Sequence, residues 1–314
     1  MSQNNKALFL ALSCALSAGL FSCGGSHYVD YAYGYGTNWT IHLYEGKQSD
    51  VDDIIAFINK TSRLLDSESH VAGGLGKLNE EGRVEANPFL KEAIALGQKV
   101  ESLSQGAYSI RIGKLSNAWK ANLAKGQVVP EDEVATLTQE AKETSLAIEG
   151  NVITKTGSGD VELSSLGKGL CLDHIKTLLE EKGIKKYFID AGSSSLLFGE
   201  NSSSSGETKV RLKDAPSRSF QAKNCAVSCS SISEQNWVID GVKYSHIIDA
   251  RTGSAKANYD ALYLRGQGAG ELDALSTAYM VLGKERVGEL ESKSIDVAFI
   301  QNKEVAYASA SFLS

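Results

Sequence analysis

Residues 162–195, ELSSLGKGLCLDHIKTLLEEKGIKKYFIDAGSSS, contain the three kinds of segment from which the fold can be predicted. Apolar residues recur with helical spacing over Gly169–Lys182, and Gly183 is the residue type that commonly ends a helix. The short apolar run Lys186–Asp190 follows and is typical of a buried strand. Small residues over 191–195 then indicate a turn. This order predicts helices packed against a sheet.

The upstream sequence continues the same mixture of elements. Alternating, β-favouring residues over Asn38–Tyr44 predict the first strand, and Asp50–Leu65 has the spacing of an amphipathic helix with acidic residues in its first turn. A second helix is predicted from Pro88 to Ser104, preceded by the capping residue Asn87 and closed by Gly106.

Downstream, short strands outnumber helices. One helix is predicted over Glu271–Leu282, and Asp240-Gly241 predicts a hairpin turn. Strands are predicted over Lys209–Leu212, Ala226–Ser230, Trp237–Asp249, Tyr259–Arg265, Asp296–Gln301 and Val305–Ala308. Because strands and helices do not alternate regularly, we expect an α+β fold with mainly antiparallel or mixed sheets, helices packed on them, and a ligand cleft between two intimately packed lobes.

The first residues are typical of an export signal. Lys6 precedes an uncharged, mostly apolar run of 15 residues, Ala7–Phe21, whereas a membrane-spanning helix needs roughly 20. Leu20-Phe21-Ser22-Cys23 resembles the lipobox of bacterial lipoproteins, in which the cysteine thiol receives a diacylglycerol. The alternative is a soluble secreted protein that is cleaved nearby, without lipid on Cys23.

These features predict a lipoprotein signal peptide over 1–22, a lipidated tether over 23–36 and a single functional domain over 37–314. Residues 24–36 are rich in glycine and tyrosine, a composition that favours a tether. The predicted location is the cell envelope, held at a membrane by lipid and facing the periplasm or the exterior.

Composition excludes some functions. The chain has 32 basic and 38 acidic residues, a formal net charge of -6 and no basic cluster, which argues against a nucleic-acid partner. Cys14 would be removed with the signal peptide and Cys23 would carry the lipid, so Cys171, Cys225 and Cys229 remain. Their spacing is not that of a zinc site. At most one disulfide could form among them.

Three segments contain residues suited to chemistry on a phosphate. The first segment is Glu162–Gly169 (ELSSLGKG), which is predicted to be a strand-to-helix turn. Lys168 lies between two glycines at the predicted start of the helix, so both the backbone and the amine can approach a phosphate there. The alternative is an ordinary solvated helix entry. In Asp273–Thr277 (DALST), the two end residues share a helix face and could both reach Mg²⁺. The alternative is that Asp273 is an acidic residue of the first helical turn, favoured there by the helix dipole, and that Thr277 only packs against its neighbours.

The third segment is Tyr244–Gly253 (YSHIIDARTG), in which His246 could take a proton from a hydroxyl nucleophile. The alternative is a structural strand histidine. Taken in order, the three segments resemble the ApbE-type flavin transferases, the FAD:protein FMN transferases, whose pattern has a DLxxxxKG turn, an SHIxDPxTG segment and a DAxxT helix. The resemblance covers nearly the whole mature chain, with further matches at Gly36-Thr37, Asp66-Ser67-Glu68, Gly106-Ala107 and Asp190-Ala191-Gly192.

The resemblance implies FAD bound between lobes, Mg²⁺ on its pyrophosphate, and transfer of FMN to a threonine hydroxyl of a partner protein with release of AMP. Its implied magnesium ligands are Asp273, Thr277 and an oxygen of Ser165. It implies flavin, pyrophosphate or nucleotide contacts at Tyr35, Ala107, Tyr108, Ser109, Glu162, Lys168 and Ile248. His246 matches the histidine that helps activate the acceptor hydroxyl, and Lys168 supplies positive charge at the phosphate.

Several residues depart from the family pattern. In the loop 106–111 (GAYSIR), Ser109 replaces an aspartate and Arg111 a threonine, so an acidic nucleotide contact is missing. Arg63 stands where the family usually has an aromatic residue, and Glu162 replaces an aspartate. Arg63 and Arg111 could instead add positive charge near the diphosphate.

The sequence therefore predicts a membrane-tethered, magnesium-dependent enzyme that attaches FMN to threonine on membrane or exported redox proteins. Two alternatives remain open: an FAD pyrophosphatase that releases FMN and AMP, and a catalytically weak FAD-binding lipoprotein.

Overall fold

The computed structural model describes residues 27–201, 203, 205–233, 236–291 and 294–313. The predicted signal peptide and Cys23 lie outside the described residues. None of the described helices is both long and apolar enough to cross a membrane. Cys171, Cys225 and Cys229 all lie in the described part, and no disulfide joins them there.

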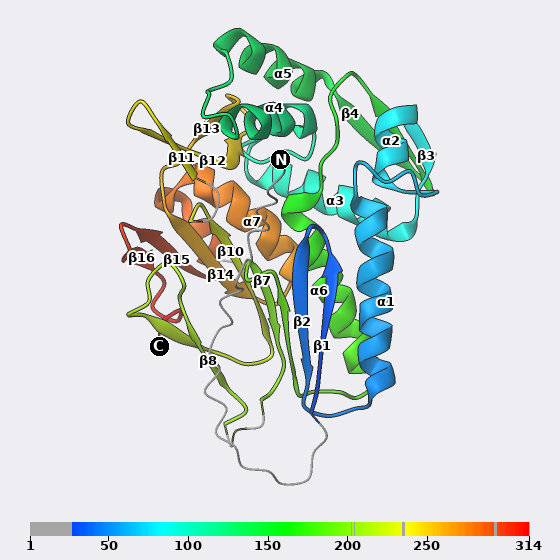
Figure 1. Cartoon of the computed structure of the whole chain (residues 1–314), viewed down its shortest axis with the longest axis vertical. Helices are drawn as coiled ribbons and strands as arrows, with labels where there is room; N and C mark the ends of the chain where they lie inside the picture. The colour runs from blue at the N-terminus through cyan, green and yellow to red at the C-terminus, as the bar shows by residue number, and fades with distance from the viewer. Residues whose placement is uncertain (1–26, 202, 204, 234–235, 292–293, 314) are drawn as a thin grey trace, which may run out of the picture.

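An eight-stranded sheet forms the centre of the fold (Figure 1). Its strand order is β1-β2-β6-β7-β10-β14-β15-β16, and each neighbouring pair is antiparallel. The strands span Tyr28–Gly34 (β1), Thr37–Leu43 (β2), Tyr187–Ala191 (β6), Ser195–Phe198 (β7), Cys225–Ser231 (β10), Ala261–Gly266 (β14), Asp296–Gln301 (β15) and Glu304–Ala308 (β16). This confirms the predicted α+β class with antiparallel pairing.

Three smaller sheets complete the β-structure of the described residues. They are β11-β12-β13 (Asn236–Ile239, Val242–Asp249, Ser254–Lys256), β3-β5-β4 (Arg83–Glu85, Val152–Thr156, Ser145–Glu149) and β8-β9 (Thr208–Arg211, Ser219–Ala222). Asp240 and Gly241, with φ of 50° and 77°, turn the chain between β11 and β12, so the predicted hairpin is confirmed.

The helices pack mainly on one face of the large sheet or above its end. They span Gln48–Leu65 (α1), Leu75–Glu81 (α2), Pro88–Leu103 (α3), Gly113–Leu123 (α4), Glu131–Glu143 (α5), Ser164–Glu181 (α6), Ala269–Leu282 (α7), the 3₁₀ turn Lys284–Arg286 (η1) and Gly288–Glu291 (α8). Asn87 caps α3 as predicted, because its side-chain oxygen accepts a hydrogen bond from the Phe89 N–H at 3.0 Å.

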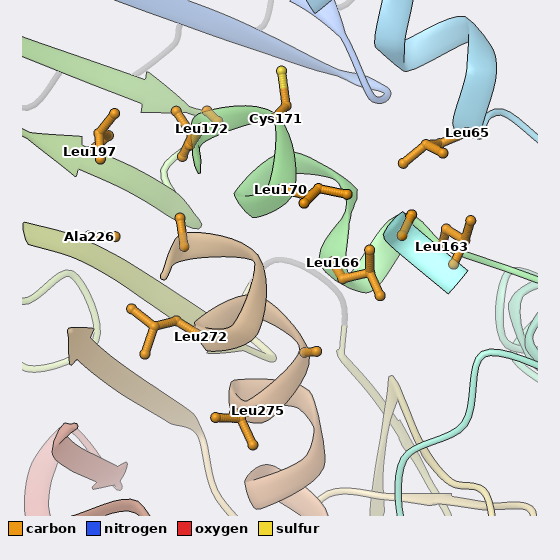
Figure 2. Packing of buried hydrophobic residues seen from close by; sticks show 14 of the residues in the cluster. Leu65, Leu163, Leu166, Leu170, Cys171, Leu172, Leu197, Ala226, Leu272 and Leu275 are labelled. Atoms are coloured by element: carbon orange, nitrogen blue, oxygen red, sulfur yellow. The ribbon is translucent and has the colours of Figure 1, made fainter. Parts of the chain in front are cut away.

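The main core lies between the sheet and the pair α6 and α7 (Figure 2). Leu166 and Leu170 of α6 and Leu272 and Leu275 of α7 all belong to this core, and all four are at most 3% exposed. Strands β7 and β10 contribute apolar residues from the sheet, including Leu197. The two helices that carry the predicted chemical residues are therefore held by the most buried part of the molecule.

The structure corrects the start of the helix predicted from Gly169. Helix α6 begins at Ser164, so Lys168 lies inside it and not in a turn before it. Leu163 and Leu166 are buried and continue the apolar spacing upstream. Gly167, a turn residue in the sequence prediction, instead allows close contact, since a Cβ there would lie 2.9 Å from the Tyr35 ring.

The predicted tether over 23–36 is also too long at its carboxyl end. Residues 28–34 form β1, which pairs along its whole length with β2, and Thr37 begins β2 one residue before the predicted strand. Tyr35 and Gly36, with φ of 55° and 73°, make the connecting turn. The sequence did not show the alternation of polar and apolar residues that is typical of a strand, because tyrosines lie on both faces of β1.

Candidate functional site

The carboxylate of Asp273 joins α7 to the start of α6. Its Oδ2 accepts hydrogen bonds from the Gly169 N–H at 2.8 Å and from the Ser195 hydroxyl at 2.7 Å. Asp273 is only 5% exposed, so it is a buried carboxylate with fixed orientation. Two of the three predicted segments therefore meet at hydrogen-bond distance, although about a hundred residues separate them in the chain.

Burial raises the pKa of Asp273 to about 6, while the positive charge of Lys168 and hydrogen bonds from neighbouring groups act in the opposite direction. Lys168 therefore lies close enough to influence this carboxyl group. Within the described residues, Lys168 forms no ion pair at 4.0 Å or less. A half-buried amine beside a buried carboxylate suits an anionic ligand that also binds a cation.

The loop that follows α3 contacts the first and the third of the predicted segments. The Tyr108 hydroxyl and the Ser165 hydroxyl are 3.0 Å apart, which ties the loop to the first turn of α6. The Ala107 carbonyl accepts a hydrogen bond from the Ala250 N–H at 3.1 Å, which ties it to the end of β12. Tyr108 is buried, and this burial raises the pKa of its hydroxyl.

The next residue of the loop, Ser109, is also buried, and its hydroxyl accepts a hydrogen bond from the Arg111 N–H.

The segment with His246 lies on β12, which packs against α7 and is joined to the loop after α3 by the bond from Ala250 to Ala107. His246 is exposed, whereas Ile248 is 4% exposed and packs with Leu115 and Trp119 in a separate small core. The Ile248 side chain is thus enclosed by protein, so any contact of this residue with a ligand has to use its backbone. The Trp119 indole N–H donates to the Gly253 carbonyl at 2.8 Å and anchors the end of the segment.

Tyr35 and Glu162 flank the start of α6. The Tyr35 ring packs against Gly167, and burial raises the pKa of its hydroxyl. The Glu162 N–H donates to the Ile110 carbonyl at 2.8 Å, and its carboxylate accepts from Ser164 at 2.5 Å. The predicted contacts at Tyr35, Glu162 and Lys168 therefore surround one helix start.

The oxygens predicted to hold Mg²⁺ form a chemically suitable set. Thr277 lies one helical turn after Asp273, and its hydroxyl donates to the Asp273 carbonyl at 3.4 Å, so the two side chains share a face of α7. The hydrogen bonds from Gly169 and Ser195 both go to Oδ2 of Asp273, and Oδ1 takes part in neither. The described residues contain no cluster of three or more His, Cys, Asp or Glu that could hold a metal. With one carboxylate, the set suits a hard ion that takes its other oxygens from hydroxyls, carbonyls, water and a phosphate ligand.

Arg111 has protein partners that the sequence did not reveal. Its guanidinium pairs with Glu101 and donates to the Thr144 carbonyl at 2.5 Å. Arg63 is exposed near the end of α1. Since the Arg111 charge is already compensated by Glu101, the structure gives no support to its proposed role at the diphosphate.

The serines around Asp273 were not among the predicted site residues. Ser195 holds the carboxylate directly, and Ser228 and Ser230 of β10 hydrogen-bond the Ser276 hydroxyl at 3.1 and 2.8 Å. The only signal in the sequence was the small-residue turn over 191–195, which gives no indication of a partner 78 positions away.

Two depressions of about 400 and 350 Å³ lie elsewhere, on the side of α7 that faces α3. Both are lined by Lys99, Gly268 and Glu271, and neither by Lys168, Asp273 or His246. The position of the predicted ligand cleft therefore rests on the converging residues and not on these depressions.

Removal of the Lys168 charge tests its part in the site. We expect Lys168→Met to lower any reaction on a phosphate ligand about a hundredfold, because a positive charge near the developing negative charge is lost. The matched control is Lys176→Met on the same helix, where the amine donates to Gln267. Turnover rates of both variants measure the effect, and an equal loss in both would remove Lys168 from the site.

The fold and the converging residues define an α+β protein with an oxygen-donor and lysine site suited to a phosphate ligand. The ApbE family matches residues 35–300, and the chain belongs to this family. A FAD:protein FMN transferase of Vibrio cholerae is 28% identical over 84% of this chain and 83% of its own length. The FAD:protein FMN transferase of Buchnera aphidicola is 26% identical over 79% of this chain and 78% of its own length.

Solved structures show the same fold. The ApbE protein of Thermotoga maritima superposes with a TM-score of 0.80 at 19% identity, covering 92% of this chain and 100% of that one. The flavin transferase ApbE of Vibrio cholerae gives a TM-score of 0.74 at 21% identity, covering 92% of this chain and 99% of that one. Family membership and the fold class predicted from the sequence are thereby confirmed.

Proposed function

We propose that this protein is an FAD:protein FMN transferase, which moves FMN from FAD to a threonine hydroxyl of a partner protein and releases AMP, in a Mg²⁺-dependent reaction. The relatives that match most of the chain carry the name FAD:protein FMN transferase. The observation that carries the proposal for this chain is the contact of the Gly169 N–H with the Asp273 carboxylate, beside Lys168.

In this reaction the acceptor oxygen forms a bond to the FMN phosphorus while the bond to the AMP oxygen breaks. Asp273, Thr277 and Ser165 are the residues that would hold Mg²⁺, which when bound supplies charge neutralisation on the pyrophosphate. Lys168 binds a phosphate oxygen and stabilises the charge that develops there. His246 accepts the proton from the acceptor hydroxyl.

The proposed flavin and nucleotide contacts come from the loop around Tyr108 and from the start of α6. The hydrogen bond between Tyr108 and Ser165 holds these two parts together, and the bond from Ala250 to Ala107 adds the β12 segment. The missing acidic contact at Ser109 predicts weaker nucleotide binding than an aspartate would give.

We also propose that the protein is exported and anchored by lipid on Cys23. The apolar run over 7–21 and the lipobox-like LFSC support this location. Membrane or exported redox proteins are then the acceptors within reach.

The function is tested by incubating the purified protein with FAD, Mg²⁺ and a candidate acceptor protein. We expect covalently bound flavin on the acceptor, seen as in-gel fluorescence and as a mass increase equal to the FMN group. Free FMN with AMP and no labelled acceptor would identify a pyrophosphatase. Intact FAD that stays bound without turnover would identify a binding protein, and either result overturns the transferase.

A further inference from the structure

The outer face of β1 and β2 is an open aromatic surface. Val29, Tyr31 and Tyr33 project from β1 and are 40%, 69% and 66% exposed, and these tyrosines are the two most exposed large apolar side chains of the described residues. Their partners on β2 are His42, Thr40 and Asn38. We refer to these six residues as the β1–β2 face.

The rest of the same sheet face is covered by protein. The hairpin β8-β9 and Phe312 pack over β7, β10, β14 and β15 and form a second core there. On the opposite side of β1 and β2, Trp39 and Ile41 are completely buried beneath α1. Among the residues that the structure describes, nothing packs over the β1–β2 face, which continues a sheet surface that is covered elsewhere.

The β1–β2 face carries no charged side chain of β1 or β2. Its one titratable member besides the tyrosines, His42, has a pKa lowered by burial and by the neighbouring His27, so it is neutral at pH 7. On the adjoining strand β6, Phe188 stands beside His42 and Asp190 beside Thr40, and the Asp190 carboxylate accepts from the Ser193 N–H at 2.6 Å. The six side chains of the β1–β2 face are thus uncharged at pH 7, with the Asp190 carboxylate at their edge, and exposed tyrosines are enriched at the boundary between lipid headgroups and acyl chains.

The chain leaves the domain on this same face. His27 stacks on His42 and on Tyr44, with ring centroids 5.5 and 4.8 Å apart. His27 is only four positions after Cys23, a reach of at most about 14 Å for extended chain. Lipid on Cys23 would hold the β1–β2 face close to the bilayer.

We propose that the β1–β2 face lies against the membrane surface, with Tyr31 and Tyr33 at the headgroup level, so that the anchored domain has one fixed orientation. This inference rests on the proposed lipid anchor at Cys23. Strand β1 leads into Tyr35, which packs on Gly167, the neighbour of Lys168. Helix α6 packs on the opposite side of the sheet from the β1–β2 face, so this orientation would hold its start at a fixed distance from the membrane, one sheet layer away.

The test uses the full lipidated chain in vesicles of phosphatidylcholine and phosphatidylglycerol with brominated acyl chains, which quench nearby tryptophan. Tyr31→Trp places a reporter on the β1–β2 face, and Val238→Trp is the matched control, since Val238 is 65% exposed on β11 in a separate sheet. The parent chain with its own three tryptophans supplies the background. We expect the added emission of Tyr31→Trp to be quenched at least about twofold more than that of Val238→Trp.

The possible results distinguish failure of the proposed lipid anchor from failure of the proposed orientation. If the chain does not sediment with the vesicles, the lipid anchor is wrong and this inference fails with it. If the chain sediments and both reporters are quenched equally or not at all, the anchor stands and the fixed orientation is wrong. A Tyr31→Trp emission that changes with protein concentration, and not with brominated lipid, would overturn the proposal and identify a second copy on this face.

Discussion

Asp273→Asn is expected to lower flavin transfer by about a thousandfold or more, because a metal-assisted step loses several kcal/mol of charge stabilisation when its carboxylate ligand is neutralised. The fold should survive, since the side-chain oxygen of asparagine can still accept from the Gly169 N–H and the Ser195 hydroxyl, which now hold Asp273. The initial rate of acceptor labelling, measured over a range of Mg²⁺ concentrations, gives the effect.

The matched control for this variant is Glu271→Gln on the same helix. Glu271 pairs with Lys99 at 2.8 Å on the surface, and such pairs contribute about 0–1 kcal/mol to stability. We expect this control to keep its Mg²⁺ response. Asp273→Asn protein that is folded and retains the parent rate and Mg²⁺ dependence would contradict the assignment of Asp273 as a metal ligand.

The elements that the sequence predicted well are those with local signals. Asn87-Pro88 marked the start of α3, Asp240-Gly241 marked the β11-β12 turn, and Gly183, with φ of 72°, follows α6 as expected. Each signal depends on neighbouring residues only, because a cap, a proline or a left-handed turn is decided within a few positions.

Contacts that span long stretches of chain could not be predicted in the same way. The bond from Ser195 to Asp273 and the bond from the Trp119 indole to the Gly253 carbonyl join residues 78 and 134 positions apart, and both depend on how the elements pack, which no local pattern encodes. The motif order indicated that the segments around Lys168 and Asp273 belong together, but not that a backbone N–H joins them. The start of α6 was missed because Gly167 and Gly169 resemble turn residues, although they serve close packing.

Gly169 is where this close packing is tightest, and Gly169→Ala should be strongly destabilising. An added Cβ would lie 2.2 Å from the Ala269 carbonyl oxygen and 2.7 Å from the Gly270 nitrogen, and neither is a flexible side-chain end. Helices α6 and α7 would have to separate. We expect the free energy of unfolding to fall by about 2–3 kcal/mol, measured by urea denaturation.

The same displacement should reduce activity about a hundredfold even in protein that remains folded, because it moves Lys168 and the Gly169 N–H away from their present positions relative to Asp273. Gly288→Ala is the matched control: Gly288 is also helical, a Cβ added there would meet no atom within 4 Å, and the variant should gain up to about 1 kcal/mol from the better helix former. Since helices α6 and α7 carry both the core and the candidate site, stability and transfer should decline together in Gly169→Ala, and neither should decline in Gly288→Ala. A Gly169→Ala protein with parent stability and parent activity would show that the approach of the two helices is not what positions the lysine and the carboxylate.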